Sequence, residues 1–146
     1  MFDNFGINIS NLFKKAEKER MDLHHPYVGT EHLLLAILKS NDECLKILNK
    51  YNITYESFYK ELTIIVGSSS KEVTINLYTP LLKRVINNAL NKSKENNNGI
   101  VTIRHLLISM LEEGEGIAIR LLVGMNIDID SLYDELKNND KLINKN

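Results

Sequence analysis

Apolar residues recur at helical spacing in the first half of the chain and predict four helices. The first carries one apolar stripe. The second, whose expected N-cap is Thr30, is apolar nearly all round and should be buried on several sides. A short third helix follows, and Thr54 caps a fourth. The apolar positions are, helix by helix, Ile9, Leu12, Phe13, Ala16 and Leu23; Leu33 to Leu38; Leu45, Ile47 and Leu48; and Phe58, Leu62, Ile65 and Val66.

The second half of the chain predicts four more helices in the same order. Thr79-Pro80 is the clearest start signal, a cap residue followed by proline at the first helical position. A buried helix is expected at 103–111, a short one at 117–123, and a last one capped by Asp128. The inward positions of the first and last of these helices are Leu82, Val85, Ile86 and Ala89, and Ile129, Leu132 and Leu136.

The two halves align residue by residue. His32 and the three apolar residues after it recur at His105, which is an offset of 73; beyond the turn at 41–43 the offset becomes 74 and pairs Asn52 with Asn126. A length change confined to a turn indicates a duplicated helical unit. We therefore predict one all-α domain, residues 1–139, with about eight helices in two pseudo-twofold repeats.

The expected boundaries are 5–66 for repeat one, 67–77 for a polar linker, 78–137 for repeat two and 140–146 for a polar tail. The strand-like stretch at 73–77 is too short to found a sheet. Six residues of the two buried helices should form the core: Leu33, Leu34, Ile37, Leu106, Leu107 and Met110.

Composition narrows the class of protein. The chain has 146 residues and a formal net charge of −1, so it lacks the basic excess that nucleic-acid binding requires. The chain has no run of about 18 apolar residues, so no membrane span is predicted. The first four residues lack the features of a signal peptide. One cysteine, Cys44, cannot form an internal disulfide, so a reduced, cytoplasmic setting is expected.

The sequence offers no catalytic residues, metal ligands or cofactor motif that we would assign. It lacks a nucleophile with a base, and the phosphate-binding loop GxxxxGK[ST], so we expect neither ATP binding nor hydrolysis. His24 and His25 are adjacent and cannot share a helix face, and no pair of residues has zinc spacing. His32 and His105 are expected to be structural, each bonded to a backbone group.

Glu31 has two possible roles. It lies in the first turn of a buried helix, where a carboxylate favours the helix dipole by a few tenths of a kcal/mol up to about 1 kcal/mol. The alternative role is in a binding site, because a carboxylate attracts a guanidinium and helix-start N–H groups attract anions. The equivalent position in the second repeat is Arg104, a charge reversal, so the second repeat cannot share this function.

Three segments resemble the Clp N-terminal (Clp R) domain, the duplicated helical module at the front of ClpC- and ClpA-type AAA+ unfoldases. They are YVGTEHLLLAIL at 27–38; INLYTP at 75–80 with KRVI at 83–86, which is similar to the ClpC-type start of the second repeat; and LEEGEGIA at 111–118. The resemblance spans about residues 1–137. It implies a non-catalytic domain that docks adaptor proteins and protein substrates before an ATPase ring unfolds them.

The resemblance also implies a phosphoarginine site, as in ClpC-type members. Glu31 of the Gly29-Thr30-Glu31 motif would take the guanidinium, and Thr79 and Lys83 would help to hold the phosphate. The symmetric pocket would need threonine at position 6 and glutamate at position 104, where this chain has Gly6 and Arg104. One such site is therefore expected, not two.

Other interpretations stay open at this level. The chain lacks the ATPase modules, so it is either a fragment of a Clp ATPase or a stand-alone module that acts as an adaptor or decoy. A small hydrolase is one alternative, but the sequence shows no nucleophile–base pair to support it. A helical DNA-associated regulator lacks a basic stripe.

Overall fold

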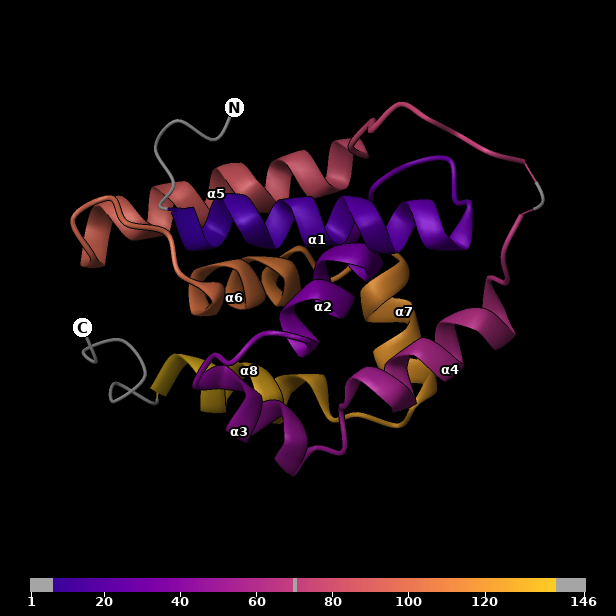
Figure 1. The fold of residues 1–146 in the computed structure, drawn as a ribbon. Helices are drawn as coiled ribbons and strands as arrows, with labels where there is room; N and C mark the ends of the chain where they lie inside the picture. The colour runs from indigo at the N-terminus through magenta and orange to yellow at the C-terminus, as the bar shows by residue number, and fades with distance from the viewer. Residues whose placement is uncertain (1–6, 70, 139–146) are drawn as a thin grey trace.

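A computed structural model describes residues 7–69 and 71–138, and every regular element in these ranges is a helix (Figure 1). The helices are α1 (Ile7–Leu23), α2 (Thr30–Leu38), α3 (Cys44–Lys50), α4 (Tyr55–Ile65), α5 (Pro80–Asn96), α6 (Ile103–Glu113), α7 (Ile117–Gly124) and α8 (Ile129–Asn138). None of them is long and apolar enough to cross a bilayer. The predicted all-α class is confirmed. Residues 5 and 6 and the tail at 140–146 lie outside the described residues.

The helices of the two halves begin at matching positions. Helices α1 and α5 each have 17 residues and start 73 residues apart, at Ile7 and Pro80. The turns before α4 and α8 also match, because Asn52 and Asn126 both adopt the left-handed conformation, with φ of 61° and 62°. Asparagine tolerates this conformation better than most residues do. The same residue type makes the same turn in each half.

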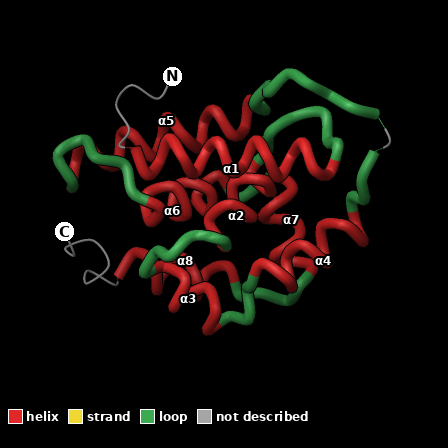
Figure 2. The backbone as a smooth tube through the Cα atoms, viewed as in Figure 1, coloured by secondary structure: helices red, strands yellow, loops and turns green. Residues whose placement is uncertain are grey.

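The halves interlock. Helix α1 packs on α2 and α5 packs on α6 within each half, whereas α3 packs on α8 and α4 packs on α7 across the halves. Figure 2 shows the helices joined by loops, and the described parts of the linker, 67–69 and 71–77, lie between the end of α4 and the start of α5. The short helices of one half therefore complete the core of the other.

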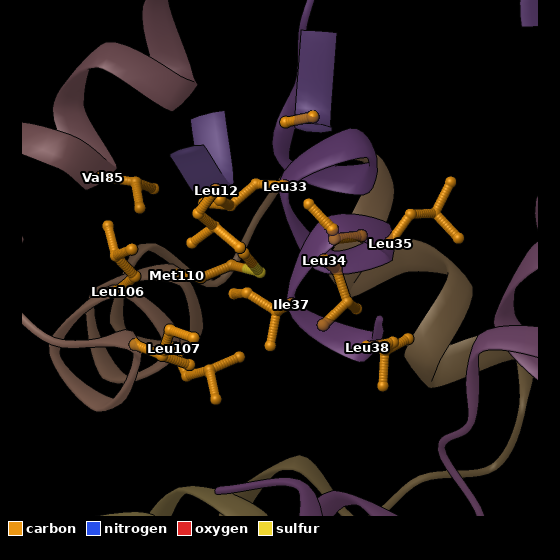
Figure 3. Packing of buried hydrophobic residues seen from close by; sticks show 14 of the residues in the cluster. Leu12, Leu33, Leu34, Leu35, Ile37, Leu38, Val85, Leu106, Leu107 and Met110 are labelled. Carbon is orange, nitrogen blue, oxygen red and sulfur yellow. The ribbon is translucent and has the colours of Figure 1, made fainter. Parts of the chain in front are cut away.

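All eight helices contribute residues to the core, and α2 and α6 lie at its centre. All six residues predicted for it are at most 3% exposed. Figure 3 shows Ile37 of α2 and Met110 of α6 pointing toward one another, with Leu33 and Leu34 on one side and Leu106 and Leu107 on the other. Helix α2 is buried along its whole length, as its unbroken apolar run predicts.

Two predicted details are wrong. The N-cap of α2 is Gly29, and Thr30 is the first helical residue. Ile65 and Val66, assigned to the apolar positions of α4, are 57% and 43% exposed. They lie in the last turn and at the C-cap, where the chain leaves the core for the linker.

An ion pair joins the first two helices of each half, with its signs exchanged. In the first half Glu19 of α1 lies 3.0 Å from Lys39, at the end of α2, and Tyr55 of α4 donates a hydrogen bond to Glu19. The positions 73 residues later are Lys92 and Glu112, whose charged atoms lie 2.5 Å apart. There Tyr133 of α8 donates to Glu112.

Candidate functional site

A single parallel bridge brings the starts of α2 and α5 together. The Val28 N–H donates to the Leu77 carbonyl at 2.8 Å, and the Thr79 N–H donates to the Val28 carbonyl at 3.0 Å. Because the two segments run parallel, the N-caps that follow them, Gly29 and Thr79, lie beside one another. The sequence-predicted site residues of the two repeats therefore meet at two adjacent helix starts.

Glu31 is the acidic group of this site and is only 5% exposed. Burial raises its pKa to about 7, and a hydrogen bond with its own backbone opposes part of that rise. Its carboxylate lies 4.0 Å from Nδ1 of His32, which is not a counter-charge because burial keeps that ring neutral. A carboxyl group that is half protonated near neutral pH differs from the ionised carboxylate that would favour the helix dipole.

Gly29 leaves room for the Glu31 carboxyl group. A Cβ atom at position 29 would lie 2.3 Å from Oε1 of Glu31 and 3.0 Å from its Cδ. Any larger residue at 29 therefore has to displace the carboxyl group.

We expect Gly29→Ala to lower the Glu31 pKa from about 7 toward its ordinary value near 4.5, because the displaced carboxyl group moves toward water. Titration of the Glu31 side-chain carbon by NMR measures this directly. Gly124→Ala is the control, since that glycine is helical and remote in sequence from Glu31. Titration of Glu31 near pH 7 in both variants would contradict the prediction.

The other predicted site residues are placed less favourably. The Thr30 hydroxyl is buried and accepts the Ala118 N–H at 3.3 Å, so it ties α2 to α7. The Thr79 hydroxyl accepts the Leu82 N–H at 3.1 Å. Lys83 is exposed one turn further along α5. Because Pro80 has no N–H and Leu82 uses its own on Thr79, the start of α5 offers fewer free amides than the sequence suggests.

Two imidazoles behind Glu31 form an ordered chain of hydrogen bonds. Gly67 O can only accept, so His25 donates to it from Nε2 at 2.7 Å. His25 Nδ1 must then accept from His32 Nε2 at 2.8 Å. His32 Nδ1 accepts the Gly29 N–H at 3.0 Å. Each ring therefore accepts at one nitrogen and donates from the other. Burial, together with the charge of Arg20, lowers the pKa of His32 to about 3.

The two histidines and Glu31 form a cluster of residue types that can bind a metal ion, although their spacing in the sequence does not predict one. One ligand atom each of His25, Glu31 and His32 lies within 4.8 Å of the others. The proximity depends on the 24–29 turn, which no spacing rule describes. All four ring nitrogens already have partners, so a metal ion would have to replace the bond between the two rings. The arrangement suits a structural role better than metal binding.

The structural role predicted for His32 and His105 is confirmed. Each ring accepts a backbone N–H at its own helix start through Nδ1, from Gly29 and Thr102 respectively, both at 3.0 Å. His105 donates from its other nitrogen to the Asn96 side chain. Cys44 is 1% exposed, and burial raises the pKa of its thiol, in keeping with a core residue.

Arg104 shows why the equivalent position of the second half differs. Its buried guanidinium donates to the carbonyls of Leu136 and Lys137, both at 2.7 Å, and so satisfies the end of α8. The sequence suggested an Arg104 that repels a ligand in a second pocket. The structure instead turns its guanidinium to α8, where it stabilises the fold. Gly6, the other half of that pocket, lies outside the described residues.

Sequence reasoning missed Arg20, whose guanidinium is fully buried beneath the linker. A signal was present, because Arg20 follows Ala16 by four residues and precedes Leu23 by three. It therefore lies on the apolar stripe of α1. Charged residues on an apolar stripe are rarely buried unless a partner compensates them, so Arg20 could have been flagged from the sequence.

The family profile described as "Clp repeat (R) N-terminal domain" matches this chain twice, at residues 4–90 and 77–146. Among curated relatives, the "ATP-dependent Clp protease ATP-binding subunit ClpC" of Staphylococcus aureus is 29% identical over 130 residues, and that of Staphylococcus epidermidis is 30% identical. The match covers 88% of this chain but 16% of each relative.

Solved structures of low sequence identity share the fold. The N-terminal domain of ClpD from Arabidopsis thaliana has a TM-score of 0.77 at 20% identity and covers 97% of both chains. The Hsp104 N-terminal domain from Candida albicans has a TM-score of 0.74 at 12% identity, over 92% of this chain and 89% of that one. A ClpV N-domain solved in complex with a VipB peptide has a TM-score of 0.67 at 16% identity, over 92% and 86%.

Proposed function

We propose that this chain, which belongs to the Clp repeat (R) N-terminal domain family, is a non-catalytic module that binds adaptor and substrate proteins for a Clp ATPase. The relatives named as Clp protease ATP-binding subunits are about six times longer than the matched region, which is 16% of their length. A ClpV N-domain of the same fold holds a peptide in its solved complex. The second fact supports a binding role for this chain.

The finer proposal is that the Glu31 site recognises phosphorylated arginine. The observation that carries it is a buried carboxyl group with no charged partner among the described residues, placed where the starts of two helices meet. A guanidinium supplies the missing positive charge and the N–H donors. The ligand's phosphate would then face α5.

The groups on α5 suit a phosphate. The Thr79 oxygen accepts the Leu82 N–H, so its hydroxyl proton remains available to donate to a phosphate oxygen. Lys83 lies four residues on, on the same helix face, and is exposed. Its ammonium group adds a positive charge on the phosphate side.

Isothermal titration with free phosphoarginine should give one site per chain. Glu31→Gln should weaken binding at least 100-fold, since it removes the charge that pairs with the guanidinium. Glu56→Gln is the matched control, because Glu56 is also a first-turn glutamate, on α4, and is exposed. Two equivalent sites, or equal affinity for the Glu31→Gln chain, would refute the proposal.

Arg104→Ala is unsuitable as a binding control. It removes the donors that satisfy Leu136 and Lys137 at the end of α8 and should destabilise the fold.

A further inference from the structure

Arg20 is a buried cation without an acidic partner in the described part of the chain. It lies in the last turn of α1 and is 0% exposed. Its Nη1 donates to the carbonyl oxygens of His25 at 3.3 Å and Val73 at 2.6 Å, and its Nη2 donates to Oδ1 of Asn76 at 2.6 Å. All three acceptors are neutral. Burial of an uncompensated charge is strongly unfavourable, so this arrangement requires an explanation.

One donor of the guanidinium has no partner at all. Nε of Arg20 is the one buried side-chain nitrogen or oxygen in the described residues that lacks a hydrogen bond. The N–H groups of Nε and Nη2 point the same way and form the fork that binds both oxygens of a carboxylate. Asn76 presents one oxygen to this two-oxygen receptor. Because the Asn76 amide has one oxygen and no charge, it bonds only one arm of the fork and leaves the positive charge of the guanidinium uncompensated.

The segment that covers the fork lies on the surface, and its last residue, Leu77, is held by the Val28 N–H in the bridge between the starts of α2 and α5. We call residues 71–77 the strap; all of them are exposed or half-buried, and Ile75 and Leu77 are 63% and 52% exposed. Figure 1 shows the strap at the same end of the molecule as the last turn of α1. The Asn76 side chain can therefore leave Arg20 without opening the core.

We propose that Arg20 is a receptor for a carboxylate and that Asn76 is a built-in neutral substitute for its ligand. The strap binds Arg20 through the Val73 backbone carbonyl and through the side-chain oxygen of Asn76, three residues later. A ligand that replaces the strap should offer the same two groups, so we expect an extended peptide that carries an acidic side chain. This site takes an anion, whereas Glu31 takes a cation, so the two sites are chemically distinct. A partner's carboxylate displaces Asn76 and completes the fork.

Asn76→Asp tests the receptor without a ligand. The new carboxylate fills both arms of the fork, so the full chain should unfold about 4 °C or more above the parent protein at pH 7. The gain depends on an ionised carboxyl group whose pKa the guanidinium lowers, so it should be lost when the pH falls below about 3. Thr74→Asp is the matched control, since it places the same charge on an exposed strap position. Equal melting temperatures for the two variants would overturn the proposal.

A peptide tests the partner. The probe is a synthetic copy of residues 71–78 carrying Asn76→Asp, and the control peptide keeps asparagine. With the full chain, the acidic peptide should shift the Arg20 Nε–H resonance in NMR and the control peptide should not. A chain that itself carries Asn76→Asp should not respond, because its fork is already filled. An Nε–H resonance that ignores the acidic peptide, or that responds equally to both peptides, would refute the partner chemistry.

Discussion

A chain carrying Glu31→Gln will be more stable than the parent protein at pH 8, by about 3 kcal/mol, and should lose the proposed affinity for phosphoarginine. The folded carboxyl group has a pKa raised to about 7, whereas its ordinary value is 4.5. Each pH unit between these values costs the parent about 1.4 kcal/mol, because the unfolded chain releases a proton that the folded chain keeps. Glutamine cannot ionise and avoids this cost.

The stability difference between Glu31→Gln and the parent protein should depend on pH. The advantage of Glu31→Gln should be near zero below pH 4.5, grow between pH 4.5 and 7, and stay constant above pH 7. Urea denaturation at pH 4 and pH 8 measures both ends of this range. Glu56→Gln should change stability little at either pH, because that side chain is exposed. The same gain at both pH values would show that ionisation of Glu31 is not its cause.

Stability and binding should therefore oppose one another at position 31. A glutamate that only favoured the helix dipole would lower stability when removed. If Glu31 is neutral in the empty site and is ionised only when the proposed ligand binds, its removal should raise stability and weaken binding. Such a conflict between stability and function is common at functional residues.

Leu34→Ala and Leu107→Ala should each lower the free energy of unfolding by about 2–5 kcal/mol, because each leaves a cavity in a packed core. The two leucines are equivalent positions, 73 residues apart, and are 1% and 3% exposed. Chemical denaturation at pH 7 measures the loss. Ile64→Ala is the control, since Ile64 is 66% exposed and should change stability by about 0.5 kcal/mol or less. A loss below about 1 kcal/mol at either leucine would contradict the core assignment.

Periodicity and self-similarity in the sequence predict the helices well, because both depend on local spacing. The unbroken apolar run of α2 correctly indicates a helix buried on every side. Local spacing cannot show which group caps a helix when a neighbour competes for the role. Thr30 has the right side chain for an N-cap, but its hydroxyl serves α7 and His32 bonds the start of α2 instead.

The candidate site is predictable in its residue types but not in its surroundings. The helix starts that carry Gly29, Glu31 and Thr79 lie side by side, because Val28 pairs with Tyr78. The burial that raises the Glu31 pKa, and the bonds that the linker makes to His25 and Arg20, depend on a long loop whose path no periodicity encodes. For the same reason the apolar end of α4 could not be assigned correctly.

The exchanged ion pairs constrain how the two halves diverged. If both descend from one ancestral sequence, the change from Glu19–Lys39 to Lys92–Glu112, or the reverse, took at least two mutations. The lineage then passed through an intermediate with two like charges, or with one charge missing. The Lys39 side chain is 51% exposed, so water and salt would screen that intermediate to a penalty of about 1 kcal/mol. The same attraction is thus obtained in both halves with the acid on either helix of the pair.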